Sequence, residues 1–113
     1  MSRLESDFKT ALKKELLQMF PGCYVFYLDP NTIGHQGIPD LLILWRDRWA
    51  LLEAKRKTPT KASDFQPNQE WYIEEFDNMS FSACIYPENK EAVLNDLQQA
   101  FLSRRSTRIA KRV

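Results

Sequence analysis

An apolar stretch of the chain, residues 37 to 55, carries an acid near each end and a lysine at its close: Asp40, Glu53 and Lys55. If the chain reverses at Arg46-Asp47, paired residues of the hairpin sum to 93 and Asp40 lies opposite Glu53. Directly opposed side chains share a face, with Cβ atoms about 4.5–5.5 Å apart. Lys55, two residues beyond Glu53, shares that face. Arg-Asp is an uncommon two-residue turn, and a slip of one residue would separate the acids.

Two carboxylates this close, surrounded by Leu and Trp, cannot both ionise without a cation, because like charges in an apolar site raise the pKa of one of them. Lys55 supplies one positive charge, and a divalent cation supplies more. Mg²⁺ prefers carboxylate and carbonyl oxygens, and the carbonyl of Ala54 is a third candidate ligand. A metal beside a lysine suits phosphodiester hydrolysis. The alternative is structural: a buried ion-pair cluster, or acids that merely flank the strand ends.

The first segment, residues 3 to 20, has apolar side chains at helical spacing and is predicted to be an amphipathic helix. These are Leu4, Phe8, Ala11, Leu12, Leu16, Met19 and Phe20. Glu5 and Glu15 fall within or beside this apolar stripe. An acid on the buried face of a helix is unusual, because burying a charge is costly unless it is paired. Pro21-Gly22 is expected to end the helix.

The remaining elements follow from apolar runs separated by polar or turn-forming segments. We expect strands at 23–28, 40–45, 49–55 and 81–87, and helices at 67–78 and 88–103. Because both faces of the hairpin are apolar, helices must cover both sides of the sheet. The predicted fold is an α/β three-layer sandwich on a small mixed sheet, in the order α-β-β-β-α-β-α.

The length of 113 residues fits one domain, which we place at 1–103, followed by a tail at 104–113. No run of 18 apolar residues is present, so no membrane span is expected. The first residues lack the apolar stretch of a signal peptide, which favours a cytoplasmic location. Cys23 and Cys84 lie in apolar runs and are interpreted as core thiols rather than disulfide partners or metal ligands.

The tail is strongly basic although the net charge of the chain is only +1. It contains five basic residues and no acid: Arg104, Arg105, Arg108, Lys111 and Arg112. Such clusters bind phosphate backbones through counterion release. A solvated, disordered tail has the same composition, so the tail permits nucleic-acid binding without establishing it.

The segment Gly37-Ile38-Pro39-Asp40, twelve intervening residues and then Glu53-Ala54-Lys55 resembles the motif of the PD-(D/E)XK nuclease superfamily. Within it, the chain is most similar to small VRR-NUC-type, Holliday-junction-resolvase-like endonucleases, many of them carried by phages. Those enzymes add an acid in the first helix and a glutamine that opens the next helix, here Gln69. The resemblance runs from about Glu5 to Pro87 and implies a restriction-endonuclease-like core.

The resemblance assigns roles to individual residues. It implies that Asp40 and Glu53, with the Ala54 carbonyl, bind Mg²⁺ or Mn²⁺, and that Lys55 assists the attacking water. Glu5 is the first candidate for the helical acid, which would be a further metal ligand, and Glu15 is the alternative. Gln69 would orient Lys55 or a phosphate, although a glutamine at a helix start can also simply bond to backbone.

The implied activity is a metal-dependent endonuclease acting on DNA, structure-selective for branched substrates such as Holliday junctions or flaps. Contacts to DNA are expected from basic side chains beside the site, from the loop histidine and from the tail: Arg56, Lys57, Lys61, His35, Arg104, Arg105, Arg108, Lys111 and Arg112. A homodimer would present two sites to a branched substrate. The alternatives are a sequence-specific restriction or homing endonuclease, a non-catalytic DNA-binding accessory protein, and a plain interaction module.

Overall fold

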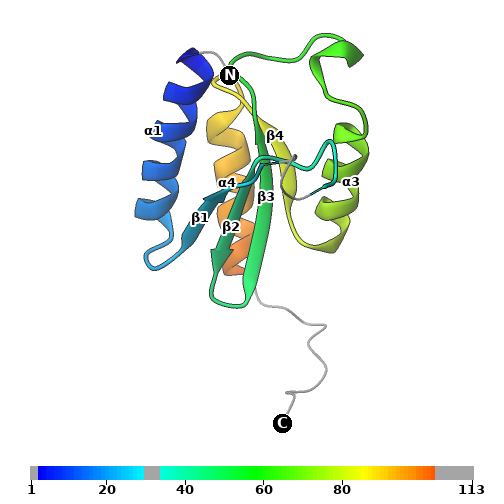
Figure 1. The fold of residues 1–113 in the computed structure, drawn as a ribbon. Helices are drawn as coiled ribbons and strands as arrows, with labels where there is room; N and C mark the ends of the chain where they lie inside the picture. Colours follow the sequence, from blue (N-terminus) through cyan, green and yellow to red (C-terminus); the bar gives the residue numbers. More distant parts are fainter. Residues whose placement is uncertain (1–2, 30–33, 104–113) are drawn as a thin grey trace.

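A computed structural model of the chain describes residues 3–29 and 34–103. The basic tail predicted to contact DNA, residues 104–113, lies outside the described residues. The elements follow in the order α1 (Arg3–Met19), β1 (Tyr24–Tyr27), β2 (Leu41–Trp45), β3 (Arg48–Ala54), a short 3₁₀ helix η1 (Ala62–Asp64), α3 (Gln69–Met79), β4 (Ser82–Ile85) and α4 (Lys90–Leu102). The expected α/β class with a mixed sheet is confirmed (Figure 1).

The four described strands form one sheet in the spatial order β1-β2-β3-β4. The pairs β1/β2 and β2/β3 are antiparallel, and β3/β4 is parallel. In the β2/β3 hairpin, Leu41 pairs with Leu52 and Trp45 with Arg48, so the predicted register, in which paired residues sum to 93, is confirmed. This register sets Asp40 and Glu53 at the same end of the hairpin.

The hairpin closes with two residues in spite of their uncommon types. Arg46 adopts φ 59°, in the left-handed region that two-residue hairpin turns require of at least one central residue. Its guanidinium lies 4.1 Å from the centre of the Trp45 ring, which provides a local contact that favours this conformation. The Trp45 indole N–H donates to the carbonyl of Pro21 at 3.0 Å, which fixes this end of the hairpin against the end of α1.

The main core lies between the sheet and the pair α1 and α4 (Figure 1). It contains the inward residues of these two helices and one alternating set of side chains from β2 and β3: Leu12, Leu16, Phe20, Leu41, Ile43, Trp45, Ala50, Leu52, Ala54, Leu97 and Phe101. The α3 helix covers β3 and β4 from the opposite side, where Phe76 meets the Trp49 ring edge-on at 6.2 Å. Helices therefore lie on both faces of the sheet.

The predicted element boundaries are close to the observed ones, with two differences. Helix α3 begins at Gln69 rather than at Pro67, because Asn68 takes φ 68° and cannot belong to a right-handed helix. The loop expected at 56–66 contains the additional turn η1. Within residues 3–29 and 34–103, no helix combines the length and the apolar character needed to cross a membrane.

Candidate functional site: a buried carboxylate pair with two lysines

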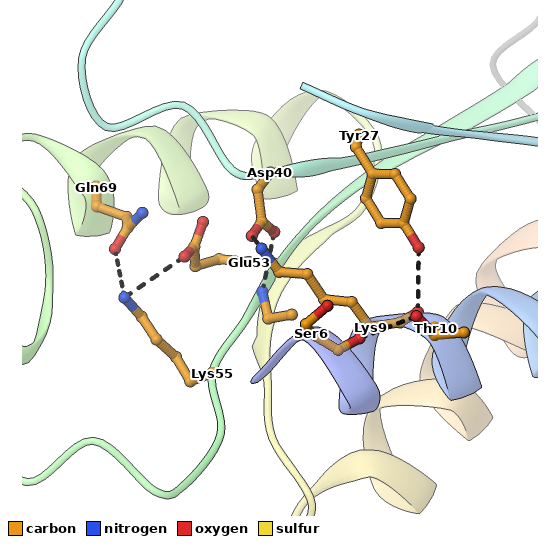
Figure 2. A network of polar contacts seen from close by, with 9 residues as sticks. Ser6, Lys9, Thr10, Tyr27, Asp40, Glu53, Lys55 and Gln69 are labelled. Carbon is orange, nitrogen blue, oxygen red and sulfur yellow. Dashed lines mark hydrogen bonds and ion pairs between the residues drawn. The ribbon is translucent and has the colours of Figure 1, made fainter. Parts of the chain in front are cut away.

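Asp40 stands at the end of the loop that enters β2, and its backbone and side chain are both held. Its carbonyl accepts a hydrogen bond from Leu28 N at 2.8 Å, which extends the β1/β2 pairing by one step. One carboxylate oxygen, Oδ1, accepts the backbone N–H of Ala54 at 3.1 Å. The other, Oδ2, forms an ion pair with the ammonium of Lys9 on α1 (Figure 2). Asp40 is therefore fixed by α1, β1 and β3 together.

Glu53 lies on β3 between the core residues Leu52 and Ala54, and its side chain points to the opposite face of the sheet from theirs. The residue is only 6% exposed. One oxygen, Oε2, lies 3.4 Å from the Lys55 ammonium. The other, Oε1, is buried and has no hydrogen-bond partner among the residues that the structure describes. A buried carboxylate oxygen without a donor is costly, so this atom is the position where a further ligand is most needed.

Lys55 and Gln69 form the third side of the site. Lys55 follows β3 directly, and its backbone N–H donates to Ile85 O at 2.8 Å, which continues the β3/β4 pairing. Its Nζ donates to Gln69 Oε1 at 3.0 Å and lies 5.3 Å from the centre of the Phe65 ring. Gln69 is 2% exposed, although it opens a helix. These contacts hold the ammonium toward Glu53 rather than toward solvent.

Gly37 explains how the loop before Asp40 meets the helix that carries Gln69. Its φ is 96°, which side-chain-bearing residues rarely adopt. A Cβ atom at this position would lie 2.9 Å from Gln69 N and would also collide with the carbonyl of Pro67. Glycine is required here for both reasons, and the close contact brings the Gly37–Asp40 loop against the start of α3.

Four charged side chains, those of Lys9, Asp40, Glu53 and Lys55, come together at the site. Figure 2 shows the carboxyl group of Glu53 between Asp40 on one side and the Lys55 ammonium on the other, with Lys9 beyond Asp40. The pKa of Glu53 is raised from 4.5 to about 7, mainly by burial and next by the negative charge of Asp40, while Lys55 and Lys9 oppose the rise. Two lysines are therefore not enough to make ionisation of Glu53 easy.

The pKa of Cys84 is also affected by the negative charge of Glu53. Cys84 pairs with Glu53 across β3 and β4 and is a free thiol, but it is only partly buried and lies outside the core cluster, unlike Cys23, which is the core thiol that the sequence predicted. Burial, with the negative charge of Glu53 as the next cause, raises the pKa of Cys84 to about 12. The thiol stays protonated at neutral pH and is neither a nucleophile nor a thiolate ligand in this state.

Lys9 was not anticipated from the sequence. It is 7% exposed and lies on the inward side of α1, one turn before Leu12. Its spacing of three from Leu12 and seven from Leu16 places it within the apolar stripe. A lysine on a buried helical face implies an acidic partner, and that was the available signal. Here the partner is Asp40.

The two acids of α1 lie in different places. Glu5 lines an open cleft of about 280 Å³ together with Lys55 and the segment that follows it; the lining comprises Glu5, Lys55, Arg56, Lys57, Thr58, Pro59 and Asp64. Glu15 forms an ion pair with Lys90 of α4, at 3.0 Å. The structure therefore brings Glu5, and not Glu15, to the Lys55 side of the site.

The predicted DNA-contacting residues that the structure describes lie in three places. Arg56 and Lys57 are exposed and line it. Lys61 is exposed at the start of η1, where its N–H donates to Asp64 at 3.2 Å. His35 is exposed beside α3, with Nδ1 3.3 Å from the Tyr72 hydroxyl. Arg56 and Lys57 therefore share the cleft with the acids Glu5 and Asp64, Lys61 contacts the cleft lining through Asp64, and His35 lies against α3.

A divalent cation fits part of this arrangement. The buried, unpartnered Oε1 of Glu53 and the adjacent Asp40 carboxylate are hard oxygen donors, which Mg²⁺ and Mn²⁺ prefer. The structure shows Ala54 donating its N–H to Asp40, with the residue fully buried. Over residues 3–29 and 34–103, no group of three or more His, Cys, Asp or Glu side chains is arranged to hold a metal. The protein thus offers two carboxylates, and Glu5 does not join them as a third.

No protein-family model matches this chain, and neither a curated protein nor a solved structure matches it.

Proposed function

We propose that this protein is a metal-dependent endonuclease that hydrolyses DNA phosphodiester bonds. One observation carries the proposal: a Glu53 oxygen is buried without a donor among the residues that the structure describes, next to a second carboxylate and a lysine held by a glutamine. A cluster that served only to stabilise the fold would be expected to satisfy its buried oxygens. The unpaired oxygen favours a site completed by a cation.

Each residue has a role that follows from its contacts. Asp40 and Glu53 hold the divalent ion through carboxylate oxygens. When bound, Mg²⁺ or Mn²⁺ neutralises charge that develops on the phosphate and lowers the pKa of nearby water. Lys55, held at 3.0 Å by Gln69, directs its ammonium toward the acids and orients the attacking water by hydrogen bonding. Gln69 acts through Lys55 and is a positioning residue.

The cleft beside Lys55 is the proposed entry of the DNA backbone. Arg56 and Lys57 line it and add positive charge where phosphates would lie. Glu5, on the same cleft, is the proposed helical acid. Lys61, His35 and the basic residues of the tail would extend the contact to flanking DNA.

We place the chain in the PD-(D/E)XK superfamily, close to the VRR-NUC-type enzymes, with a restriction-endonuclease-like core. The order of the motif residues supports this assignment, as does the observed register that brings Asp40 next to Glu53. A small domain offers little surface for recognising a long sequence, which favours branched DNA as the substrate.

The proposed homodimer would present two such sites to one branched molecule. Three exposed apolar side chains lie on the face of β1 and β2 opposite the main core, where the paired residues Tyr24 and Leu44 are 65% and 38% exposed and Phe26 is 45% exposed. Apolar patches of this kind are common at subunit contacts. Light scattering on the purified protein measures the mass in solution, and a monomer at all concentrations would remove this part of the proposal.

A non-catalytic DNA-binding protein is the second candidate, and the Lys9–Asp40 ion pair favours it. With Lys9 and Lys55 both charged, two ammonium groups balance two carboxylates without a metal. In that case the cluster would be a buried ion-pair network with a structural role.

A cleavage assay separates the two candidates. Labelled four-way junction, flap and linear duplex are incubated with the protein and Mg²⁺, Mn²⁺ or EDTA. We expect metal-dependent cleavage that is faster on branched DNA. Asp40→Asn and Lys55→Met should each lower the rate about a hundredfold or more, because each removes a group placed at the reacting atoms.

Asp47→Asn is the matched control, since Asp47 lies in the hairpin turn at the far end of β2 and β3. It should cleave like the wild type. DNA binding by the wild type without cleavage in any metal would establish the accessory role and refute the enzyme.

A further inference from the structure

The Lys9 ammonium is the one contact to the carboxylate pair that comes from α1 in the described residues, and it is buried. Lys9 is 7% exposed, although lysine heads usually reach solvent. Its Nζ pairs with Asp40 Oδ2, the carboxylate oxygen that does not accept the Ala54 N–H (Figure 2). A cation therefore already stands at one of the two proposed metal ligands.

Charge counting shows that this cation and a metal compete. The two carboxylates carry two negative charges when ionised, and Lys9 and Lys55 carry two positive ones. A divalent ion added to the unchanged group would leave an excess of two positive charges in a buried site, which is strongly unfavourable. One ammonium must move away from the carboxylates before the ion is bound well.

The contacts indicate which lysine moves. Lys55 Nζ is held by Glu53 and by Gln69 and stands over the Phe65 ring. Among the described residues, Lys9 Nζ has its single ion-pair partner in Asp40. An open cleft of about 380 Å³ adjoins it, lined by Ser6, Lys9, Thr10, Tyr27, Leu28 and Asp40. A flexible four-carbon side chain can turn into that space without any shift of α1.

We propose that Lys9 is a resident cation that occupies the Asp40 carboxylate in the metal-free protein and is displaced by the divalent ion. This inference rests on the proposed metal site and adds a residue that sets its affinity. Lys9 keeps the paired acids compensated while no metal is present, and it lowers the apparent affinity for the ion in proportion to the fraction of molecules in which Asp40 is free of the lysine. The metal site is then loaded only at ion concentrations high enough to displace the lysine.

Calorimetric titration with MnCl₂ tests this inference on the wild type, Lys9→Met and Lys13→Met. Met keeps most of the length of lysine and removes its charge. Lys13 is the matched control because it lies one turn further along α1, with Nζ 5.4 Å from the centre of the Tyr27 ring rather than on a carboxylate. If Lys9 occupies Asp40 in nine of ten metal-free molecules, Lys9→Met should bind Mn²⁺ about tenfold more tightly than the wild type. Lys13→Met should match the wild type.

The outcomes separate this inference from the proposed function. Tighter Mn²⁺ binding by Lys9→Met, with Lys13→Met unchanged, supports the role of Lys9 as a resident cation. If Lys9→Met binds Mn²⁺ and the wild type does not, the role of Lys9 is still supported, but the proposed metal-dependent enzyme is refuted. Equal or weaker binding by Lys9→Met overturns the inference and leaves the enzyme standing. If neither the wild type nor Lys9→Met binds Mn²⁺, the proposed enzyme and the proposed role of Lys9 are both refuted.

Loss of Lys9 leaves Asp40 without its compensating cation next to the buried Glu53, so the variant is also followed by circular dichroism over a thermal scan. We expect a lower midpoint than the wild type without metal, and a larger increase on adding Mn²⁺. A Lys9→Met protein that stays unfolded at every Mn²⁺ concentration would show that the lysine supports the fold alone, and would overturn the inference.

Discussion

The two faces of β3 differ in what stabilises the side chains buried on them: apolar packing on one face and ion pairing on the other. Ala50, Leu52 and Ala54 point into the apolar core beneath α1 and α4, and all three are 0% exposed. Glu53, between the last two, is almost as buried but faces the α3 side, where Lys55 and Gln69 meet it. A shift of one residue thus separates a core that depends on packing from a site that depends on compensating charge.

The comparison indicates what a buried acid needs in this fold. On the site face, two lysines and a backbone N–H contact the carboxylate pair, and one oxygen of Glu53 still has no donor within the described residues. A network selected only for stability would be expected to give every buried oxygen a donor. The buried Glu53 oxygen without a donor among the described residues, rather than an excess of negative charge, is the physical basis for proposing a bound cation.

The largest effect is expected from moving an acid to the wrong face. Leu52→Asp places a carboxylate in the apolar core, where the described neighbours are aliphatic or aromatic. An uncompensated buried charge should lower the free energy of unfolding by about 5 kcal/mol, enough to unfold a small domain. Urea denaturation followed by circular dichroism measures it. Leu52→Met is the control and should lose less than about 1.5 kcal/mol. A stable Leu52→Asp protein would contradict the comparison.

A smaller, pH-dependent effect is expected from neutralising Glu53. Its pKa rises from 4.5 to about 7 on folding, so between these pH values the folded protein binds more protons than the unfolded chain. The free energy of unfolding therefore falls as the pH rises through this window, by roughly 3 kcal/mol in total for this group.

Glu53→Gln should remove that decline. Urea denaturation in EDTA at pH 5 and pH 8 should show the variant gaining stability relative to the wild type as the pH rises. Asp47→Asn, which changes an acid in the turn, should keep the wild-type slope. Identical slopes for Glu53→Gln and the wild type would mean that Glu53 titrates normally.

The smallest effect is expected at Glu15. Its ion pair with Lys90 is partly exposed on both sides, and such pairs contribute less than about 1 kcal/mol. Glu15→Gln should therefore keep wild-type stability within that margin and wild-type cleavage of DNA.

Glu5→Gln should cleave more slowly, because Glu5 lines the cleft with Lys55. Loss of cleavage in Glu15→Gln alone would reverse the assignment of the helical acid.

The sequence predicted the parts of the site that depend on strand periodicity. Alternating apolar residues and a two-residue turn fixed the register, and the register determined that Asp40 and Glu53 come together. The resemblance left Lys55, a phosphate and the backbone as possible partners of Gln69, and the structure shows the hydrogen bond to Lys55. Patterns of this kind depend on residues close together in the chain and can be recognised in the sequence alone.

The parts that depend on packing between distant elements were not predicted. Helical spacing gave Glu5 and Glu15 equal standing, and only the placement of α4, with Lys90 next to Glu15, distinguishes them. Lys9 was overlooked because lysines commonly lie at the edge of an apolar stripe with the head in solvent. Its burial results from the loop before β2 reaching across to α1.

The central claim is that Asp40 and Glu53 hold a divalent cation, and diffraction from crystals grown with Mn²⁺ tests it most directly. At the manganese absorption edge, the account predicts an anomalous peak within about 2.5 Å of Glu53 Oε1 and of an Asp40 oxygen. The Lys9 ammonium should then be turned away from Asp40, and Glu53→Gln crystals should lack the peak. Wild-type crystals at saturating Mn²⁺ with no peak at these oxygens, and with Lys9 still on Asp40, would contradict it.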